Sequence, residues 1–190
     1  MSRPELDEIE LADPPQAWEA LGFTVHDGVV ALGGVRIRLG GAVALKLRGL
    51  DGDHDFDGLP ISASTTLPPP PPPAMHAIGA TGIDHVVALT PDLDRTTAKL
   101  RAAGFDHRAT RGRQAFFVIG ACLLELVGQA DGHATVWGLT LVVEDLDEAA
   151  RQLGDRLGPA KDAVQPGRRI ATVRSREAGL TTALALMSPR

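Results

Sequence analysis

The sequence predicts an α+β fold of repeated βαβββ modules, whose paired curved sheets form a cup with the helices outside. Two internal repeats carry this prediction. Residues 82–104 (GIDHVVALTPDLDRTTAKLRAAG) match residues 135–158 (TVWGLTLVVEDLDEAARQLGDRLG) at a constant offset of 53, and each copy has the pattern of a strand, a corner and a helix. Residues 116–128 (FFVIGACLLELVG) match residues 29–41 (VVALGGVRIRLGG) at an offset of 87, as two apolar strands joined by a tight turn. Such self-similarity indicates one supersecondary unit used several times.

The repeated helices have recognisable starts. Asp92 and Asp145 precede them as N-caps, and Glu148 is expected to complete a capping box with Asp145. The second helix carries one apolar stripe, which should pack on a sheet; it consists of Leu146, Ala149, Ala150, Leu153 and Leu157. The N-terminal copy has a shorter helix beginning at Pro14-Pro15, where proline is well tolerated.

Six consecutive prolines, Pro68 to Pro73, mark a boundary in the chain. They lack amide donors and favour an extended polyproline II rod, so they predict a semi-rigid spacer, with a ligand for an SH3-like partner as the alternative. The expected parts are an N-terminal βαβββ-like module with a truncated partner strand (1–66), a proline-rich linker (67–77), and a second domain (78–190) of paired modules (82–128 and 135–188).

An acidic loop, Asp51 to Asp57 (DGDHDFD), precedes the proline run. Alternating aspartates in a glycine-containing loop are typical of calcium sites, but the spacing and the closing glutamate of an EF-hand are missing. We therefore interpret this segment as a solvated loop.

Composition excludes several classes of partner. A net charge of −5 argues against nucleic acid, which requires a basic face. The single cysteine, Cys122, excludes an internal disulfide framework. The longest uncharged, largely apolar run, residues 115–124, is too short for a membrane helix, and residues 1–11 lack the apolar core of a signal peptide. We expect a cytoplasmic protein without a membrane partner.

His85 and Glu125 are the candidate catalytic residues. Both lie on predicted apolar strands, and strand alternation puts Val87 on the same face as His85. A neutral pair of this kind can serve in general acid–base catalysis if burial raises the pKa of the carboxyl group. The alternative for Glu125 is a purely structural ion pair, for example with Arg113.

Four further residues are candidates for ligand binding. Trp137, at the start of a predicted strand, is suited to stacking on a ligand ring, with core packing as the alternative. Two adjacent arginines on a strand point to opposite faces, so only one of Arg168 and Arg169 can line the cup. We expect Arg169 in that role. Arg113 and Phe116 lie at the equivalent hairpin of the central module.

The modules resemble the βαβββ unit of the vicinal oxygen chelate superfamily, which includes glyoxalase I, extradiol dioxygenases, methylmalonyl-CoA epimerase and bleomycin-resistance proteins. The resemblance rests on IDHVV at residues 83–87, PDLD at 91–94, LLELV at 123–127, and the duplicated unit at 135–188. It implies a small-molecule ligand in the cup. It also implies one divalent metal ion, bound by His or Glu from the first and last strands of two paired modules.

His85 and Glu125 match two of the four metal-ligand positions, but the second module departs from the pattern. When the two modules are aligned, Gly138 takes the position of His85, and Ala185 takes the position of Glu125. In the N-terminal module the corresponding residues are Leu6 and Arg38. A cation held by two protein ligands would bind weakly. Either further ligands come from elsewhere, such as His76, His107, His133 or the acidic loop, or the metal site is lost.

These observations predict a glyoxalase-like small-molecule-binding protein with a degenerate metal site. The first alternative is a divalent-metal-dependent lyase, isomerase or dioxygenase that uses His85 and Glu125. The second is an interaction module whose N-terminal unit pairs with another chain to form a homodimer. The residues leave open whether the protein is an enzyme.

Overall fold

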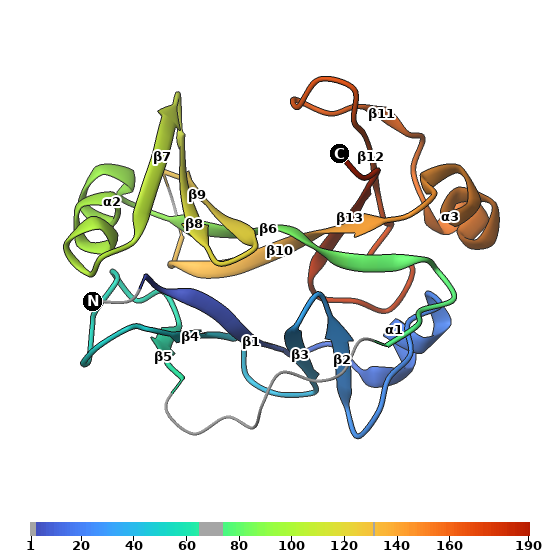
Figure 1. Ribbon diagram of the computed structural model, residues 1–190, viewed down its shortest axis with the longest axis horizontal. Coiled ribbons are helices and arrows are strands. Elements are labelled where there is room, and N and C mark those ends of the chain that lie inside the picture. The colour runs from blue at the N-terminus through green and yellow to red at the C-terminus, as the bar shows by residue number, and fades with distance from the viewer. Residues whose placement is uncertain (1–2, 65–73, 131) are drawn as a thin grey trace.

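The computed structural model describes residues 3–64, 74–130 and 132–190, which form two curved sheets stacked on one another (Figure 1). The proline run at 68–73 and most of the predicted linker lie outside the described residues. None of the helices within the described ranges has the length and apolar character needed to cross a membrane.

The larger sheet has eight strands in the order β11-β12-β13-β10-β6-β9-β8-β7. Its first module consists of β6 (Ala80–Thr90), α2 (Leu93–Ala102), β7 (Asp106–Arg111), β8 (Gln114–Ile119) and β9 (Cys122–Gly128). Its second consists of β10 (Thr135–Val143), α3 (Leu146–Leu153), a 3₁₀ turn (Gly154–Arg156), β11 (Lys161–Asp162), β12 (Arg169–Thr172) and β13 (Ala183–Met187). Each first strand runs parallel to its module's last strand, and β6 pairs with β10 in antiparallel orientation. The predicted fold class of paired βαβββ modules is confirmed.

The helix starts follow the predicted caps in part. Asp92 accepts a hydrogen bond from the backbone of Arg95, and Asp145 accepts from the amides of Asp147 and Glu148. The side chain of Glu148 bonds forward to Arg151 and Gln152, so the predicted reciprocal half of the capping box was wrong. A local N-cap can therefore be predicted from the sequence, whereas the rotamer of a solvent-exposed glutamate cannot.

The smaller sheet has the same order of connections between its strands, with shorter elements. Its elements are β1 (Glu5–Leu11), α1 (Pro15–Ala20), β2 (Val29–Leu32), β3 (Val35–Leu39), β4 (Ala44–Arg48) and β5 (Ile61–Ala63), in the sheet order β2-β3-β1-β4-β5. β1 runs parallel to β3 and antiparallel to β4, and β5 runs parallel to β4. Thus β4 and β5 occupy the places of the first and last strands of a second module.

A β-bulge with an aspartate lies at the same point of both sheets. Asp84 is the extra residue of β6, because the residues on either side of it pair with consecutive residues of β10. Asp7 is the extra residue of β1 against β4 in the same way. This register matches Glu8 to His85, so the prediction of Leu6 at that place was wrong. The stretch between the first strand and the hairpin differs in length between the two modules. A single sequence offset therefore cannot align the first strands and the hairpins at once.

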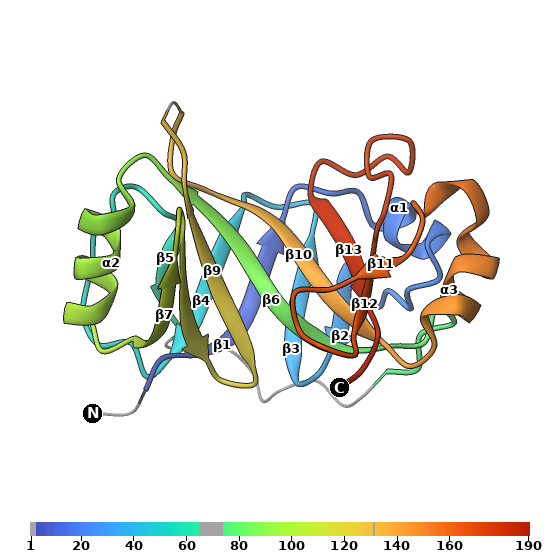
Figure 2. The same cartoon turned by 90° about the horizontal axis from the view of Figure 1, so that it is seen from above.

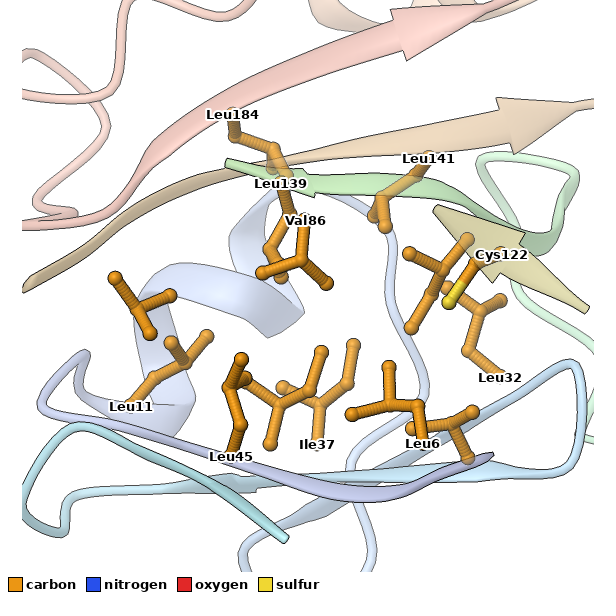
Figure 3. Close-up of a cluster of buried hydrophobic side chains, with 14 of the residues drawn as sticks. Leu6, Leu11, Leu32, Ile37, Leu45, Val86, Cys122, Leu139, Leu141 and Leu184 are labelled. Atoms are coloured by element: carbon orange, nitrogen blue, oxygen red, sulfur yellow. The ribbon is translucent and has the colours of Figure 1, made fainter. Parts of the chain in front are cut away.

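The two sheets share one hydrophobic core (Figure 3). The smaller sheet presents Leu6, Leu11, Leu32, Ile37 and Leu45, and the larger presents Val86, Cys122, Leu139, Leu141 and Leu184. Helices α2 and α3 lie at the two ends of the larger sheet (Figure 2). The larger sheet curls away from the smaller one, which leaves it a concave face on the opposite side (Figure 1). The division into domains at 1–66 and 78–190 stays a prediction.

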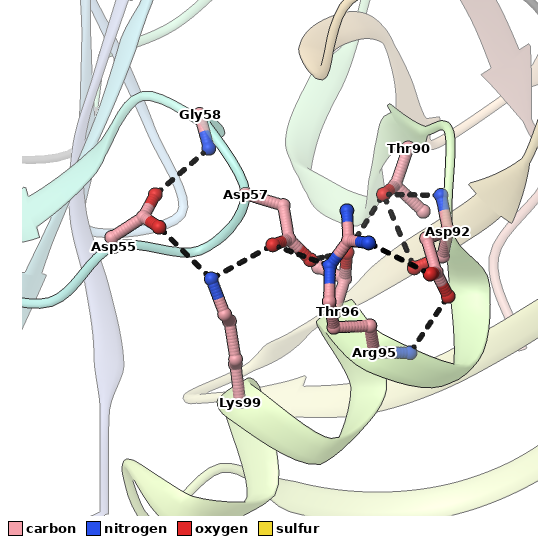
Figure 4. Close-up of polar contacts among 8 residues, drawn as sticks. All are labelled: Asp55, Asp57, Gly58, Thr90, Asp92, Arg95, Thr96 and Lys99. Carbon is pink, nitrogen blue, oxygen red and sulfur yellow. Dashed lines mark hydrogen bonds and ion pairs between the residues drawn. The ribbon is translucent and has the colours of Figure 1, made fainter.

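The acidic loop is docked on helix α2 (Figure 4). Asp57 lies within 2.7 Å of Lys99 Nζ and accepts hydrogen bonds from Arg95 Nε at 2.9 Å and Thr96 Oγ1 at 2.5 Å. Phe56 is buried, with its ring 5.7 Å from that of Phe105. The interpretation as a solvated loop was therefore wrong for its last two residues. Apolar Phe56 gains by burial, and Asp57 finds charged partners there.

Candidate functional site

His85 and Glu125 lie together on the concave face of the larger sheet. β6 and β9 are neighbours, with Val87 directly beside Glu125, so His85 is two residues away along β6. His85 Nε2 is 3.5 Å from Glu125 Oε2, and the two side chains are 16% and 14% exposed. The core-facing side of the same strands carries Val86, so strand alternation separates the polar face from the apolar one.

Both ring nitrogens of His85 have partners. Nδ1 is 2.9 Å from Asp84 Oδ2, and Nε2 is 2.9 Å from the hydroxyl of Thr140. Thr140 lies directly opposite His85 in the β6–β10 pair. The bulge at Asp84 lets the side chain of this adjacent residue reach the imidazole, which strict alternation would prevent.

Asp84 is buried between His85 and Arg168. Its Oδ1 forms a close ion pair with Arg168 Nη1, and the two side chains are almost completely buried. Burial raises the pKa of the Asp84 carboxyl group. The hydrogen bonds and charges of His85 and Arg168 outweigh that effect and lower the pKa to about 2. Arg168 Nε also donates to the carbonyl of Ser188 at 2.9 Å.

Glu125 is held by an amide and not by an arginine. Gln114 Nε2 donates to Glu125 Oε1 at 2.6 Å, and Phe116 is paired with Glu125 across β8 and β9. The alternative ion pair with Arg113 is not the arrangement found, because Arg113 Nε donates to the carbonyl of Gly128 at 2.9 Å. Phe116 therefore lies next to the His85–Glu125 pair, and Arg113 lies at the hairpin turn.

The remaining predicted ligand contacts fall in different places. Trp137 is 53% exposed and lies, with Gly138, in a bulge of β10 opposite Val87. Arg169 is exposed and forms an ion pair with Asp147 at 2.9 Å. Of the two arginines, Arg168, which precedes β12, is the one that contacts Asp84 beside His85, and a ligand contact of Arg169 stays a prediction.

The donor set does not fit a metal ion of the kind that the resemblance implies. Gly138 and Ala185 supply no ligand, and Thr140 opposite His85 is bonded to the imidazole. Within residues 3–64, 74–130 and 132–190, no group of three or more His, Cys, Asp or Glu side chains is placed to hold an ion. Of the residues considered as substitute ligands, His76 is bonded between the Thr24 amide and the Ala31 carbonyl, and His107 is bonded to Thr110.

The equivalent positions of the smaller sheet are filled by ion pairs. Glu8, the counterpart of His85, is fully buried, with Lys46 Nζ at 2.9 Å and Arg38 Nη2 at 3.1 Å. Burial raises the pKa of Glu8, but the hydrogen bonds from Lys46 and Arg38 lower it overall. Its charged groups satisfy one another, so the candidate site is on the larger sheet.

Two cavities lie away from the concave face. One of about 500 Å³ lies at the junction of the two sheets and is lined by Gly33, Met75, His76, Thr81 and Glu144, among others. Another of about 380 Å³ lies near the start of α2. Its lining includes Asp92, Arg113 and Gln129. Neither lining includes His85 or Glu125, so neither cavity is the candidate site.

Sequence reasoning missed Asp84, Gln114, Thr140 and Arg168. Alternation places Asp84 on the face opposite His85, and no sequence signal marked the bulge that overrides it. Thr140 was within reach, because antiparallel pairing of the two first strands brings it opposite His85.

Comparison with solved structures finds similarity over part of this chain. Methylmalonyl-CoA epimerase from Mycobacterium tuberculosis is 21% identical, with 59% of this chain and 90% of that chain covered and a TM-score of 0.48. A Streptomyces coelicolor methylmalonyl-CoA epimerase in complex with 2-nitronate-propionyl-CoA is 21% identical, with 57% and 94% covered and a TM-score of 0.46. Glyoxalase I from Zea mays is 20% identical, with 58% and 44% covered and a TM-score of 0.45.

The paired βαβββ modules predicted from the sequence are present in the structure, and the solved structures found by the comparison include methylmalonyl-CoA epimerase and glyoxalase I. No family model matches the sequence, and a search of curated proteins finds no match. The likeness to these solved structures concerns the fold alone, so the function must be argued from the site.

Proposed function

We propose that the protein binds a small organic molecule on the concave face of the larger sheet, without a protein-bound metal ion. One observation carries this proposal. His85 and Glu125 lie 3.5 Å apart on a face that the smaller sheet does not cover, while Gly138 and Ala185 stand where a metal would need further ligands. A partly exposed imidazole and carboxylate, beside the apolar side chains of Val87 and Phe116, are suited to orienting a ligand through polar contacts.

The charges of the site favour a ligand that is neutral or positively charged. The buried cationic side chain at the site, Arg168, is already paired with Asp84. Glu125 receives one hydrogen bond from Gln114 and keeps the capacity to accept more. An amine or alcohol can donate a hydrogen bond to Glu125, whereas a ligand carboxylate would be repelled by the negative charge of Glu125.

The apolar part of the ligand has contacts close by. Phe116 flanks Glu125 across the β8–β9 pair, and Val87 flanks it on β6. We propose that Trp137, exposed at the bulge of β10, stacks on a ligand ring. A cytoplasmic location and a homodimer remain predictions.

The test uses three probes with one skeleton, namely benzylamine, benzyl alcohol and benzoate, titrated into the full ¹⁵N-labelled chain. We expect amide shift changes around His85, Phe116 and Glu125 with the amine and the alcohol, and weaker changes with benzoate. Glu125→Gln should weaken amine binding more than alcohol binding, because it removes the charge and keeps the shape. Asp147→Asn, a carboxylate on α3 away from the site, is the matched control.

Two results would contradict the proposal. Shift changes confined to the two cavities, or absent with all three probes, would remove the ligand site from the concave face. Elemental analysis that finds a stoichiometric metal ion in the purified protein, lost in His85→Ala, would favour the metal-dependent enzyme.

A further inference from the structure

We infer that Asp84, oriented by Arg168, decides which nitrogen of His85 carries the proton, and so presents Nε2 as a hydrogen-bond acceptor on the concave face. Asp84 and Arg168 are thereby positioning residues that act through His85. The benefit to a ligand rests on the proposed function. The position of the proton does not, and it can be measured without any ligand.

The first step is the contact between Asp84 and the imidazole. Asp84 Oδ2 lies 2.9 Å from His85 Nδ1, at hydrogen-bond distance. An ionised carboxylate can only accept, so Nδ1 must be the donor and carry a hydrogen. A neutral imidazole has only one such hydrogen, which leaves Nε2 with a lone pair.

The second step is the role of Arg168. Its Nη1 binds the other oxygen of Asp84, Oδ1, and its Nε is fixed by the Ser188 carbonyl at 2.9 Å. Each carboxylate oxygen therefore has its own partner, and the buried guanidinium keeps the carboxylate charged. The adjacent Arg169 forms its ion pair with Asp147 on α3, so the two neighbouring arginines have different partners.

The third step is what Nε2 faces. The Thr140 hydroxyl is 2.9 Å away and can donate to the free lone pair, with Glu125 Oε2 at 3.5 Å beside it. A hydroxyl rotates easily, so a ligand donor can take the place of Thr140 at Nε2. The site would then present two acceptors, Nε2 and Glu125, to a ligand that brings donors.

A substitution at Asp84 makes this arrangement measurable. In Asp84→Asn, Arg168 can only donate, so it holds the amide oxygen of Asn and turns the NH₂ group toward Nδ1. Nδ1 must then accept, and the proton moves to Nε2. Adding Arg168→Met removes the group that orients the amide, so the double variant should lose this preference.

The experiment is long-range ¹H–¹⁵N NMR of the histidine rings at about pH 8.5, above the ordinary histidine pKa, with His85 assigned from its absence in His85→Gln. We expect Nδ1–H in the unmodified protein, Nε2–H in Asp84→Asn, and a mixture in the double variant. Asp84→Asn combined with Arg169→Met, which removes the exposed neighbour, is the matched control for the double variant and should keep Nε2–H.

The inference would be overturned by a proton on Nε2, or on both nitrogens, in the unmodified protein, or by Nδ1–H persisting in Asp84→Asn. The spectrum of the unmodified protein decides the tautomer even if a variant fails to fold. Asp84→Asn combined with Arg168→Lys, which keeps a donor at position 168, should keep Nε2–H and gives a second check on the role of the arginine. Failure of the benzylamine titration with the expected tautomer intact would count against the proposed function alone.

Discussion

At the scale of single residues, Gly138 marks a place where β10 and β13 approach each other closely. A Cβ atom at this position would lie 2.6 Å from the carbonyl oxygen of Ala183 on the neighbouring strand β13. Non-bonded carbon and oxygen do not approach so closely without displacement of the backbone. The close approach of the strands therefore requires glycine, and a metal-binding side chain is excluded there for a steric reason.

This geometry predicts the effect of a single methyl group. Gly138→Ala should lower the free energy of unfolding by about 1–3 kcal/mol, the usual cost of an overpacked site. Gly82→Ala is the matched control, because Gly82 lies on the neighbouring strand β6 with nothing within 4 Å of its added Cβ. Urea unfolding of both variants measures the difference, and equal losses would show that the contact with Ala183 is not limiting.

At the scale of elements, the acidic loop is attached to α2 mainly by Asp57 and less by Asp55. The Asp57 side chain is nearly buried among Arg95, Thr96 and Lys99, whereas the Asp55 side chain is 75% exposed. Burial raises the pKa of Asp57, but hydrogen bonds from Lys99, Thr96 and Arg95 outweigh this and lower it to about 2. The loop therefore depends on Asp57 being charged.

We expect Asp57→Asn to lower the free energy of unfolding by about 1–3 kcal/mol, because it leaves charged donors poorly paired. Asp55→Asn, which keeps the loop length and the same chemistry of substitution, should change stability little. Since the folded pKa of Asp57 lies below the ordinary value, its stabilising effect is complete above about pH 5 and is lost as the pH falls toward 2. Asp57→Asn should flatten this acid loss in thermal melts, and an unchanged profile would contradict the assignment.

At the scale of the whole molecule, the two sheets depend on each other for burial. The side of the larger sheet opposite the concave face is covered by the smaller sheet, with Val86 and Leu139 meeting the apolar face that includes Ile37 (Figure 3). A buried aspartate joins them at a second point: Asp13, at the end of β1, accepts from the amides of Thr181 and Thr182 near the start of β13, at 2.7 and 3.1 Å.

A shared core predicts one cooperative unfolding transition. The two tryptophans report on different parts, because Trp18 is buried in α1 beside the smaller sheet and Trp137 is on β10 of the larger. In Trp137→Phe, the fluorescence of Trp18 should change at the same urea concentration as the far-ultraviolet circular dichroism of the whole chain. Two separated midpoints would show that the sheets unfold as independent units.

Much of this organisation could be predicted from residues alone. The paired modules, the caps at Asp92 and Asp145, and the common face of His85 and Glu125 follow from repeats and strand alternation. These are local or periodic properties, because each copy of a module has to bury the same apolar pattern. The same repeats align Gly138 with His85, and Ala185 with Glu125.

The partners of His85 required the folded chain. Asp84 reaches the ring through a bulge, and Arg168 reaches Asp84 from a segment 84 residues away. The cover of the larger sheet by the smaller, and the docking of Asp57 on α2, likewise join segments that are distant in sequence. Bulges and strand registers depend on the packing of whole sheets. A repeat in the sequence carries no information on how one module packs against the next.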